Sequence, residues 1–563
     1  MSEEGEVMKK TLLTTCNAKY IHKNLALRWL YVTCPSQQDV KIKEYVIKDD
    51  IHKIVQEIVA SEYEVICFSC YIWNIEPIKE LVKELKACKP SLHVVLGGPE
   101  VSYESYDLID QGVDAICIGE GEKCIWEYIA MLDADTPYEV KGMYTKAFPN
   151  MEYQRVPIAW LETFENPYFL EMDKSSMNHR YLYLETSRGC PYSCAYCLSS
   201  ADRCVRMFSE PYVIDLLSKI AKSEVTQVKF LDRTFNSDPK RALRIARYIN
   251  EHCVNQIFQF EVVAETLSED LLNFFTKEAD VSRFRFEVGV QSFNSTTLKS
   301  VGRIQNNARL QEVIDRMRKA NCILHVDLIA GLPYEGMDSF HQSFNSLFDL
   351  KASELQLGIL KLLKGTRLKR ESKKYNLVAK PYAPYDVVST DWLTKEELLA
   401  LHACADAVEK FWNSSFASDA ISIMLELKWF QDPFTLFLAL GQEYLKLPRP
   451  YQPHQLLSCF YPITMDHAKE EVDAVLLMSY YKRFKQKPHR FTDVWLSNEK
   501  KKEIMQVFLD KGIANQKELF CYGLLDVAYH DHQFGYQLVL YNTNQTLPKR
   551  WFIDQSLEMI KEM

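Results

Sequence analysis

The stretch Leu184-Glu-Thr-Ser-Arg-Gly-Cys190-Pro-Tyr-Ser-Cys194-Ala-Tyr-Cys197 decides how this chain is interpreted. Its cysteines are spaced Cys-x3-Cys-x2-Cys, a pattern that 16 cysteines in 563 residues would produce by chance only about 0.01 times. Three thiolates on one loop can ligate three irons of a 4Fe-4S cluster, whereas a site made by protein alone needs four cysteines. We therefore predict a metal cluster on Cys190, Cys194 and Cys197, with one iron open to a substrate or cofactor.

Two other sites stay open for these cysteines. A structural zinc site would need a fourth cysteine or histidine at compatible spacing, and Cys204 is the only nearby cysteine. A closed cluster that only carries electrons is the second alternative.

The composition indicates a folded protein of about three or four domains, since 47% of its residues are hydrophobic. Most cysteines stand singly in apolar segments, which differs from a disulfide scaffold, so we expect reduced thiols and a cytoplasmic location. The first residues lack the basic and apolar regions of a signal peptide, and no apolar run is long enough to span a membrane. We therefore expect a soluble protein without a membrane partner.

The net charge of −9 argues against a general nucleic-acid scaffold, so a nucleic-acid partner is not expected. Two basic runs nevertheless occur, at residues 361–374 and 482–490. They are interpreted either as solvated faces or as a surface for an anionic or RNA-like substrate.

Apolar runs and helical patterns alternate over residues 1–135. Five predicted strands lie at Thr11–Thr15, Val40–Ile47, Val65–Ser69, His93–Leu96 and Ala115–Ile118. Buried strands joined by helices predict a doubly wound parallel sheet. Ligands of such sheets bind beyond the carboxyl ends of the strands, here the loops at 16–20, 69–74, 97–102 and 119–122.

A second alternating pattern covers residues 178–385, after a connecting segment at 136–177. Its six predicted strands are Tyr181–Glu185, Gln227–Leu231, Phe258–Val263, Arg283–Val290, Leu324–Ile329 and Glu354–Leu360. Six strand–helix units predict an incomplete (β/α)6 barrel with its chemistry at the carboxyl ends of the strands. The cysteine loop follows the first of these strands.

Residues 386–563 are predicted to form a mostly helical domain. The two preceding parallel-sheet domains place the chain as a whole in the α/β class. Helical patterns cover Glu396–Trp412 and Ile421–Leu445, and their aromatic residues are interpreted as core. His530 and His532 alternate on a strand-like segment, but they lack the third ligand that a metal site needs.

The cysteine motif resembles that of the radical S-adenosylmethionine enzymes, which carry an aromatic residue before the last cysteine, here Tyr196. The resemblance implies that the open iron chelates S-adenosylmethionine, and that one electron from the cluster cleaves it to a 5′-deoxyadenosyl radical. It also implies that Tyr196 contacts the cofactor and that an external electron donor of the flavodoxin or ferredoxin type is a partner.

The order of domains resembles class B of this family, whose N-terminal module binds cobalamin. The resemblance assigns cobalamin contacts to the strand-end loops, at Asn17, Ser69, Tyr71, Gly97, Gly98, Pro99, Gly119, Glu120 and Gly121. The Asp-x-His-x-x-Gly motif that supplies a lower ligand to cobalt is absent; His22 is a candidate, but its spacing from Asn17 is wrong. A generic Rossmann-like or flavodoxin-like module is the alternative, although Gly-x-Gly-x-x-Gly and phosphate-loop motifs are missing.

Later strand ends also resemble motifs of the radical S-adenosylmethionine enzymes. By resemblance, Asp232 lies near the amino group of S-adenosylmethionine, although Leu231-Asp232-Arg233 departs from the common Gly-Gly-Glu form. A second motif maps onto Glu287, Gly289, Gln291 and Ser292, toward the ribose and methionine. A third maps onto Asp327, Ile329, Gly331, Leu332 and Pro333, beside the adenine. Arg203 and Arg206, beyond the cysteine loop, either bind the cofactor carboxylate or cap the next helix.

The resemblance predicts a cobalamin-dependent radical S-adenosylmethionine enzyme, most simply a methyltransferase that acts on an unactivated carbon of a small molecule or peptide. One alternative uses both cofactors in an oxidation–reduction or rearrangement without methyl transfer. Another is a corrinoid and redox sensor without catalysis. A methylthiotransferase is disfavoured, since no second set of three cysteines is evident in the N-terminal domain. The C-terminal region resembles an uncharacterised domain appended to such enzymes, with a lid or substrate platform as its expected role.

Overall fold

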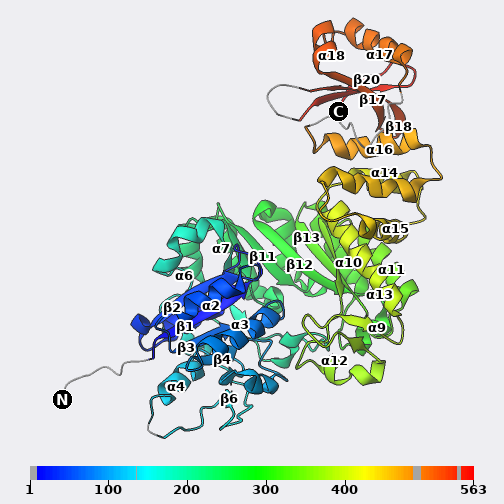
Figure 1. Cartoon of the computed structure of the whole chain (residues 1–563). Helices are drawn as coiled ribbons and strands as arrows, with labels where there is room; N and C mark the ends of the chain where they lie inside the picture. The colour runs from blue at the N-terminus through cyan, green and yellow to red at the C-terminus, as the bar shows by residue number, and fades with distance from the viewer. Residues whose placement is uncertain (1–8, 135, 486–495, 542–546) are drawn as a thin grey trace. The chain divides into compact units, whose positions relative to one another are not determined.

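A computed structural model describes residues 9–134, 136–485, 496–541 and 547–563 of the chain. The chain folds into two compact units. The first comprises the described residues within 1–325, 331–335 and 359–392, and the second comprises the described residues within 326–330, 336–358 and 393–563. Their helices and strands are labelled in Figure 1.

The N-terminal sheet of the first unit has the strand order β2-β1-β3-β4-β5-β6. The strands are β1 (Thr11–Asn17), β2 (Val40–Val46), β3 (Val65–Ser69), β4 (His93–Gly97), β5 (Ala115–Cys117) and β6 (Met143–Thr145). The first five run parallel, as predicted, and β6 pairs antiparallel with β5. β2 and β3 pair with opposite edges of β1, so the strand order reverses at β1. Doubly wound sheets bind their ligands at such a reversal.

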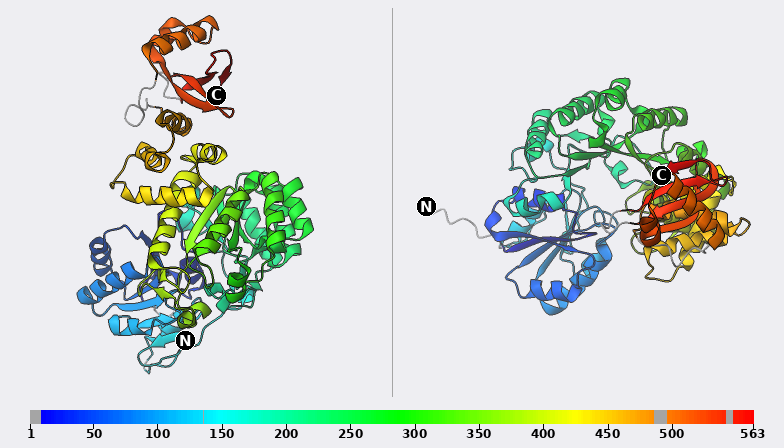
Figure 2. Two further views of the ribbon diagram at one scale, coloured as in Figure 1. Left: turned by 90° about the vertical axis from the view of Figure 1, so that its right-hand side faces the viewer. Right: turned by 90° about the horizontal axis from the view of Figure 1, so that it is seen from above.

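Helices cover both faces of this sheet, as the right-hand view of Figure 2 shows. They are α1 (Leu25–Thr33), α2 (Ile51–Val59), α3 (Ile75–Cys88) and α4 (Cys124–Met131). Leu12 of β1 packs in one apolar cluster with α2 and α3. Its neighbour Leu13 packs in the other cluster with α1 and α4. Successive side chains of a strand point to opposite faces. Since helices cover both faces of the sheet, all seven residues of β1 are buried.

Residues 136–177 form the connection between the two sheets of this unit. They contain β6 and the short helix α5 (Ile158–Leu161), and a 3-10 helix follows at Glu171–His179. The buried Arg28 guanidinium of α1 donates two hydrogen bonds to Asp173, at 2.9 and 2.8 Å. This bidentate ion pair fixes the connection to the N-terminal sheet.

The second sheet contains β7 (Leu182–Leu184), β10 (Gln227–Phe230), β11 (Ile257–Val262), β12 (Phe284–Gln291), β13 (Ile323–Ala330) and β14 (Glu354–Ile359). In the first unit, β7, β10, β11 and β12 pair in parallel in that order. The helices between them are α6 (Glu210–Ala221), α7 (Pro239–His252), α8 (Glu269–Asn273), α9 (Ser295–Ser300) and α10 (Asn307–Lys319). Asp238 caps α7 by accepting from two backbone amides, and Pro239 follows at the first helical position.

The faces of the second sheet differ in polarity because its strands alternate. In β12, Phe284 and Phe286 are buried, whereas Arg285 and Glu287 are half-buried. These buried rings pack against Phe274 and Phe275 of the π-helical turn that follows α8, and the ring centroids of Phe275 and Phe286 lie 4.7 Å apart. The polar residues therefore lie on the opposite face of the sheet.

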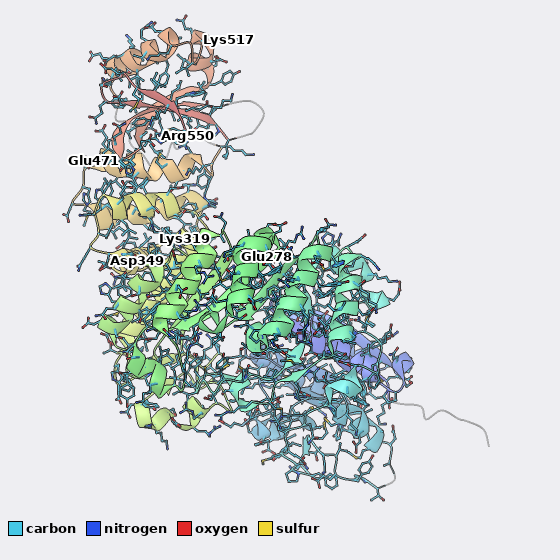
Figure 3. The ribbon with its side chains drawn as sticks, turned by 180° about the vertical axis from the view of Figure 1, so that it is seen from behind. Glu278, Lys319, Asp349, Glu471, Lys517 and Arg550 are labelled. Atoms are coloured by element: carbon cyan, nitrogen blue, oxygen red, sulfur yellow. The ribbon has the colours of Figure 1, made fainter. Side chains whose placement is uncertain are left out.

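Helices make up most of the remaining second unit. They are α13 (Lys395–Ala407), α14 (Ser418–Glu426), α15 (Pro433–Lys446), α16 (Lys469–Tyr481), α17 (Asn498–Asp510) and α18 (Gln516–Tyr522), and α11 (Met337–Asp349) also belongs to this unit. An antiparallel sheet follows, formed by β17 (Gly523–His530), β18 (Gln533–Leu540), β19 (Lys549–Asp554) and β20 (Ile560–Glu562). Figure 3 shows Arg550 on this sheet, between the helices that carry Glu471 and Lys517.

The histidines of the expected strand-like segment lie at the β17–β18 hairpin. His530 ends β17, whereas Asp531 and His532 form the turn with φ angles of +45° and +63°. His532 hydrogen-bonds Glu426 of α14 through Nδ1. Within the described residues, these side chains do not belong to any group of three that could hold a metal ion.

No helix among the described residues combines the length and the apolar character needed to span a bilayer. The second basic run falls partly at 486–490, outside the described residues.

Replacing Asp526 by Asn should remove a pH-dependent loss of stability in the second unit. Burial, opposed by a hydrogen bond from Val527, raises the pKa of Asp526 to about 7. Because this folded-state value exceeds the unfolded value, the folded carboxyl keeps its proton longer. The free energy of unfolding therefore falls between about pH 4 and pH 7, by on the order of 4 kcal/mol in total.

Asn retains an acceptor for the Tyr481 hydroxyl, which donates to Asp526 at 3.2 Å. We expect the Asp526→Asn variant to unfold at a higher denaturant concentration than the wild type at pH 8, with the difference shrinking toward pH 5. Hydrogen exchange of β17 and α16 would localise the effect. The same pH slope in both proteins would contradict the prediction.

Candidate functional site

The cysteine loop is held from one side by the chain that follows it. Gly189 has φ of +93°, and a Cβ there would lie 2.4 Å from the carbonyl oxygen of Cys204. The Cys190 amide donates to the Asp202 carbonyl at 2.9 Å. Only glycine permits this close approach of two backbones at a left-handed φ, so the turn into Cys190 is fixed by sequence.

Two other segments of the chain also hold the loop through backbone hydrogen bonds. The Ala195 amide donates to the Val301 carbonyl at 2.8 Å, and the Ala195 carbonyl accepts from Leu368 at 2.9 Å. Cys190 and Cys194, each 8% exposed, are buried, and Cys197 is half-buried. The backbone contacts therefore position the three thiols in advance of any ligand.

The donor set fits an iron–sulfur cluster. Among the described residues, no three His, Cys, Asp or Glu side chains are close enough to hold a single metal ion. A 4Fe-4S cluster instead needs one thiolate at each of three separate irons, which three cysteines of one loop can supply. Cys204, the nearby fourth cysteine, is exposed.

Asp232, predicted to face a cofactor amine, supports the start of the cysteine loop. Its carboxylate accepts from the Thr186 amide at 2.8 Å, the Thr186 hydroxyl at 2.6 Å and the Ser187 hydroxyl at 2.7 Å. Burial nevertheless raises the pKa of Asp232. These contacts explain why an acid follows β10, and its predicted contact with a cofactor stays a prediction.

Buried polar atoms without partners accompany the other predicted strand-end residues. Gln291 has φ of +68° and is 8% exposed, and its Oε1 has no hydrogen-bond partner. Both carboxylate oxygens of Glu265, beyond β11, are likewise buried without a partner, and burial raises the pKa of this group. Unpaired buried polar atoms are costly unless a ligand satisfies them, so these positions fit a polar organic cofactor.

Glu287 accepts a hydrogen bond from Gln259 on the polar face of the sheet. Gly331 has φ of +94°, so its backbone adopts a conformation that favours glycine. Asp327 falls in the second unit, and its predicted cofactor contact stays a prediction.

Arg303 was missed by sequence reasoning. Its guanidinium donates to the Gly289 carbonyl and, at 2.8 Å, to the Gln305 side chain. Its charge also opposes the rise that burial causes in the pKa of Tyr196. Arg303 thus lies between the β12 motif and Tyr196, but no local pattern around Val301-Gly302-Arg303 signals that position.

The carboxyl edge of the N-terminal sheet presents aromatic rings and amides. Tyr71 and Trp73 stack with centroids 4.4 Å apart, and Trp73 is 49% exposed. The Asn24 amide donates to the Ser69 and Tyr71 hydroxyls, each at 3.3 Å, and Asn17 donates to Glu44. A stacked pair whose Trp73 ring is exposed, at a switch point of the sheet, fits a large flat ligand.

The glycines of this edge are required by the domain itself. A Cβ at Gly98 would lie 2.5 Å from the Cys70 carbonyl oxygen, and one at Gly119 would lie 2.5 Å from that of Gln154. Gly97 would meet only Cys117 at an ordinary 3.5 Å. Direct contact of Gly97, Gly98, Pro99, Gly119 and Gly121 with a corrin stays a prediction.

His22, the candidate cobalt ligand, connects the two sheets of the first unit. Its Nδ1 forms a 2.6 Å hydrogen bond with the Tyr183 hydroxyl of β7. Burial, followed by the charges of Lys229, Lys19 and Arg180, lowers the pKa of the ring. The structure therefore gives His22 a partner in β7.

Glu120, a predicted cobalamin contact, belongs to a buried ion cluster. Its carboxylate pairs with Arg206 and, at 3.2 Å, with Arg188. Arg188 also pairs with Glu122 at 2.7 Å and Glu185 at 2.8 Å. The cluster joins the loop after β5 directly to residues on both sides of the cysteine loop. Arg206 is paired with Glu120 in this cluster, and the N-cap of α6 is Ser209.

Comparison with known families identifies the domains. A model described as the B12 binding domain matches residues 12–127, and one described as the Radical SAM superfamily matches residues 184–347. A third, described as Protein of unknown function (DUF4080), matches residues 373–546.

Curated relatives match about half of the chain. A 2-(S-pantetheinyl)-carbapenam-3-carboxylate methyltransferase from Streptantibioticus cattleyicolor is 28% identical over 332 residues, covering 52% of this chain and 46% of the relative. The cobalamin-dependent radical SAM methyltransferase TokK from Streptomyces tokunonensis is 29% identical over 329 residues, covering 53% and 47%. The chain thus spans about half the length of these curated relatives.

Solved structures share the fold. The cobalamin-dependent S-adenosylmethionine radical enzyme OxsB with aqua-cobalamin bound gives a TM-score of 0.59 at 15% identity, over 90% of this chain and 82% of that one. The methyltransferase TsrM from Kitasatospora setae, with cobalamin and a 4Fe-4S cluster bound, gives 0.55 at 15% identity, over 67% and 80%. The predicted α/β fold class is confirmed.

Proposed function

We propose that this chain, which belongs to the cobalamin-binding branch of the radical S-adenosylmethionine family, is a methyltransferase acting on an unactivated carbon atom. The cofactors of that family are cobalamin, S-adenosylmethionine and a 4Fe-4S cluster. One observation carries the proposal: the loop after β5, inside the region that the B12 binding domain model matches, is joined to the three-cysteine loop by the buried Arg188 ion cluster within one compact unit. This arrangement supports joint action of two cofactors on one substrate.

The names of the curated relatives favour methyl transfer over the alternatives. When bound, the cluster and S-adenosylmethionine supply radical chemistry, and cobalamin supplies a methyl carrier. The acceptor is proposed as a small molecule or peptide, because the net charge of −9 disfavours a nucleic acid.

The residues of this chain would bind and orient these groups. Cys190, Cys194 and Cys197 would ligate the cluster, and the unpaired Gln291 and Glu265 side chains would accept hydrogen bonds from S-adenosylmethionine. Arg303, fixed on the Gly289 carbonyl, would balance the negative charge near Tyr196. The stacked Tyr71 and Trp73 rings would cover one side of the corrin and exclude water from it.

The test is anaerobic reconstitution with iron, sulfide and cobalamin, followed by reduction in the presence of S-adenosylmethionine and chromatography of the products. We expect both 5′-deoxyadenosine and S-adenosylhomocysteine. 5′-Deoxyadenosine without S-adenosylhomocysteine, in the presence of candidate acceptors, would contradict methyl transfer and favour a redox or rearrangement enzyme. The absence of both products would favour a sensor and overturn the proposal.

A further inference from the structure

A cavity of about 360 Å³ lies against the cysteine loop within the first unit. Ser193, the residue before Cys194, forms part of its wall, and Ser200 lies just beyond Cys197. The Leu368 amide of α12 (Arg367–Arg370) donates to the Ala195 carbonyl. The wall that carries the first basic run is therefore fixed directly to the cluster-binding backbone.

Four arginines from three separate segments line this cavity: Arg155, Arg203, Arg367 and Arg370. Arg155 pairs with Asp202 at 3.1 Å, and Arg367 pairs with Glu371 at 3.5 Å. Arg370 donates to the Gly365 carbonyl. Within the part of the chain that the structure describes, no carboxylate lies in ion-pair distance of Arg203 or Arg370, and the cavity lining contains none. The cavity is thus strongly cationic in a chain whose net charge is −9.

The aromatic residues of the lining do not offer an open face to a planar ligand. Tyr103 and Tyr153 stack at 5.8 Å. The Arg155 guanidinium covers the Tyr153 ring at 5.2 Å. A Cβ at Gly365 would lie 2.4 Å from the Tyr103 ring, so the backbone there packs on that ring. Recognition of a nucleobase by stacking is therefore disfavoured, and charge is what the cavity offers.

We propose that this arginine-lined cavity is the docking site of the electron donor, an acidic flavodoxin-type protein. The inference rests on the proposed function, in which the cluster must receive electrons from outside. Carboxylates of the donor would seat among Arg203 and Arg370 and bring its flavin toward Ser193. One electron would pass from the reduced flavin to the cluster held by the three cysteines, so that the donor would be oxidised and the cluster reduced by one electron.

The electrostatics suit such a transient complex. Redox partners form small, weak interfaces, and their association is accelerated 10- to 1,000-fold by complementary charge, with a steep dependence on salt. Two guanidinium groups without carboxylate partners cost little to expose and remain available for a partner. The basic residues of the run at 361–374 therefore differ in their surroundings. Lys361 pairs with Asp386 and Lys364 pairs with Glu100, whereas Arg367 and Arg370 line the cavity.

The test compares two reductants on one charge-reversal variant, R367E/R370E, whose two arginines line the cavity on α12. With flavodoxin, flavodoxin reductase and NADPH, we expect 5′-deoxyadenosine formation to slow by about tenfold or more and to lose most of its salt dependence. With dithionite, the variant should match the wild type within about twofold, since a small reductant needs no docking surface. The variant K222E/K277E makes the same change of charge at two exposed lysines that form no ion pair within the described residues, and it should behave as wild type with both reductants.

Binding gives a readout that does not depend on turnover. Immobilised flavodoxin should bind the wild type at low salt and bind R367E/R370E about tenfold more weakly. Equal loss of activity with both reductants, or unchanged flavodoxin binding, would overturn the docking site and assign the cavity to a substrate or another small anion. If the wild type formed no deoxyadenosine even with dithionite, the proposed function would fail, while the binding comparison would still decide the docking site.

Discussion

Cys194→Ala should abolish 5′-deoxyadenosine formation and lower the iron and sulfide content of the reconstituted protein to near zero. Cys194 is 8% exposed and sits between two anchored positions. The neighbouring Ala195 backbone is held by Val301 and Leu368, contacts that a side-chain truncation at 194 leaves intact. The fold should therefore persist while the cluster loses one of three protein ligands. Iron and sulfide analysis and low-temperature electron paramagnetic resonance would measure the loss.

The matched control is Cys204→Ala. Cys204 lies in the same region and is exposed, and it contacts Gly189 through its backbone carbonyl, which alanine preserves. This variant should bind a full cluster and form deoxyadenosine at the wild-type rate. Activity in the Cys194 variant, or loss of the cluster in the Cys204 variant, would show that Cys190, Cys194 and Cys197 are not the ligands of the cluster.

Features set by local patterns could be predicted from the sequence. The alternation Phe284-Arg285-Phe286-Glu287 marks a strand with one apolar face, and the structure has β12 at that place. The strand before Cys190 places the cysteine loop at the carboxyl end of a parallel sheet, where the structure has it. Both inferences need only residues within one element, whose period is fixed by backbone geometry.

Features set by long-range pairing could not be predicted. Nothing near Glu120 in the sequence indicates that its partners, Arg188 and Arg206, lie about seventy to ninety positions later. The glycines at 98 and 119 signal a tight backbone approach, but the neighbour that requires it is the chain itself. The antiparallel sheet β17–β20 packs its apolar side against α17, and short alternating runs there do not by themselves reveal that partner.

Arg188→Met should destabilise the first unit by about 3–5 kcal/mol, because it removes the cation that three buried carboxylates share. The guanidinium pairs with Glu120, Glu122 and Glu185 at 3.2 Å or less, and each of these side chains is less than 15% exposed. Burial already raises the pKa of Glu122 despite Arg188, and its Oε2 has no hydrogen-bond partner. Without Arg188 the glutamates must take up protons or draw water into the core.

The loss should also uncouple the loop after β5 from the cysteine loop, so we expect cobalamin to be retained less well during gel filtration. Adding Glu122→Gln to Arg188→Met should recover part of the free energy of unfolding, since it removes a buried charge that has lost its partner. The control is Arg244→Met, which breaks a bidentate pair with Glu210 on an arginine whose side chain is 54% exposed. Because exposed pairs contribute about 0–1 kcal/mol, this variant should unfold near the wild-type denaturant midpoint. Equal effects of the two arginine substitutions would mean that the buried cluster does not hold the two loops together.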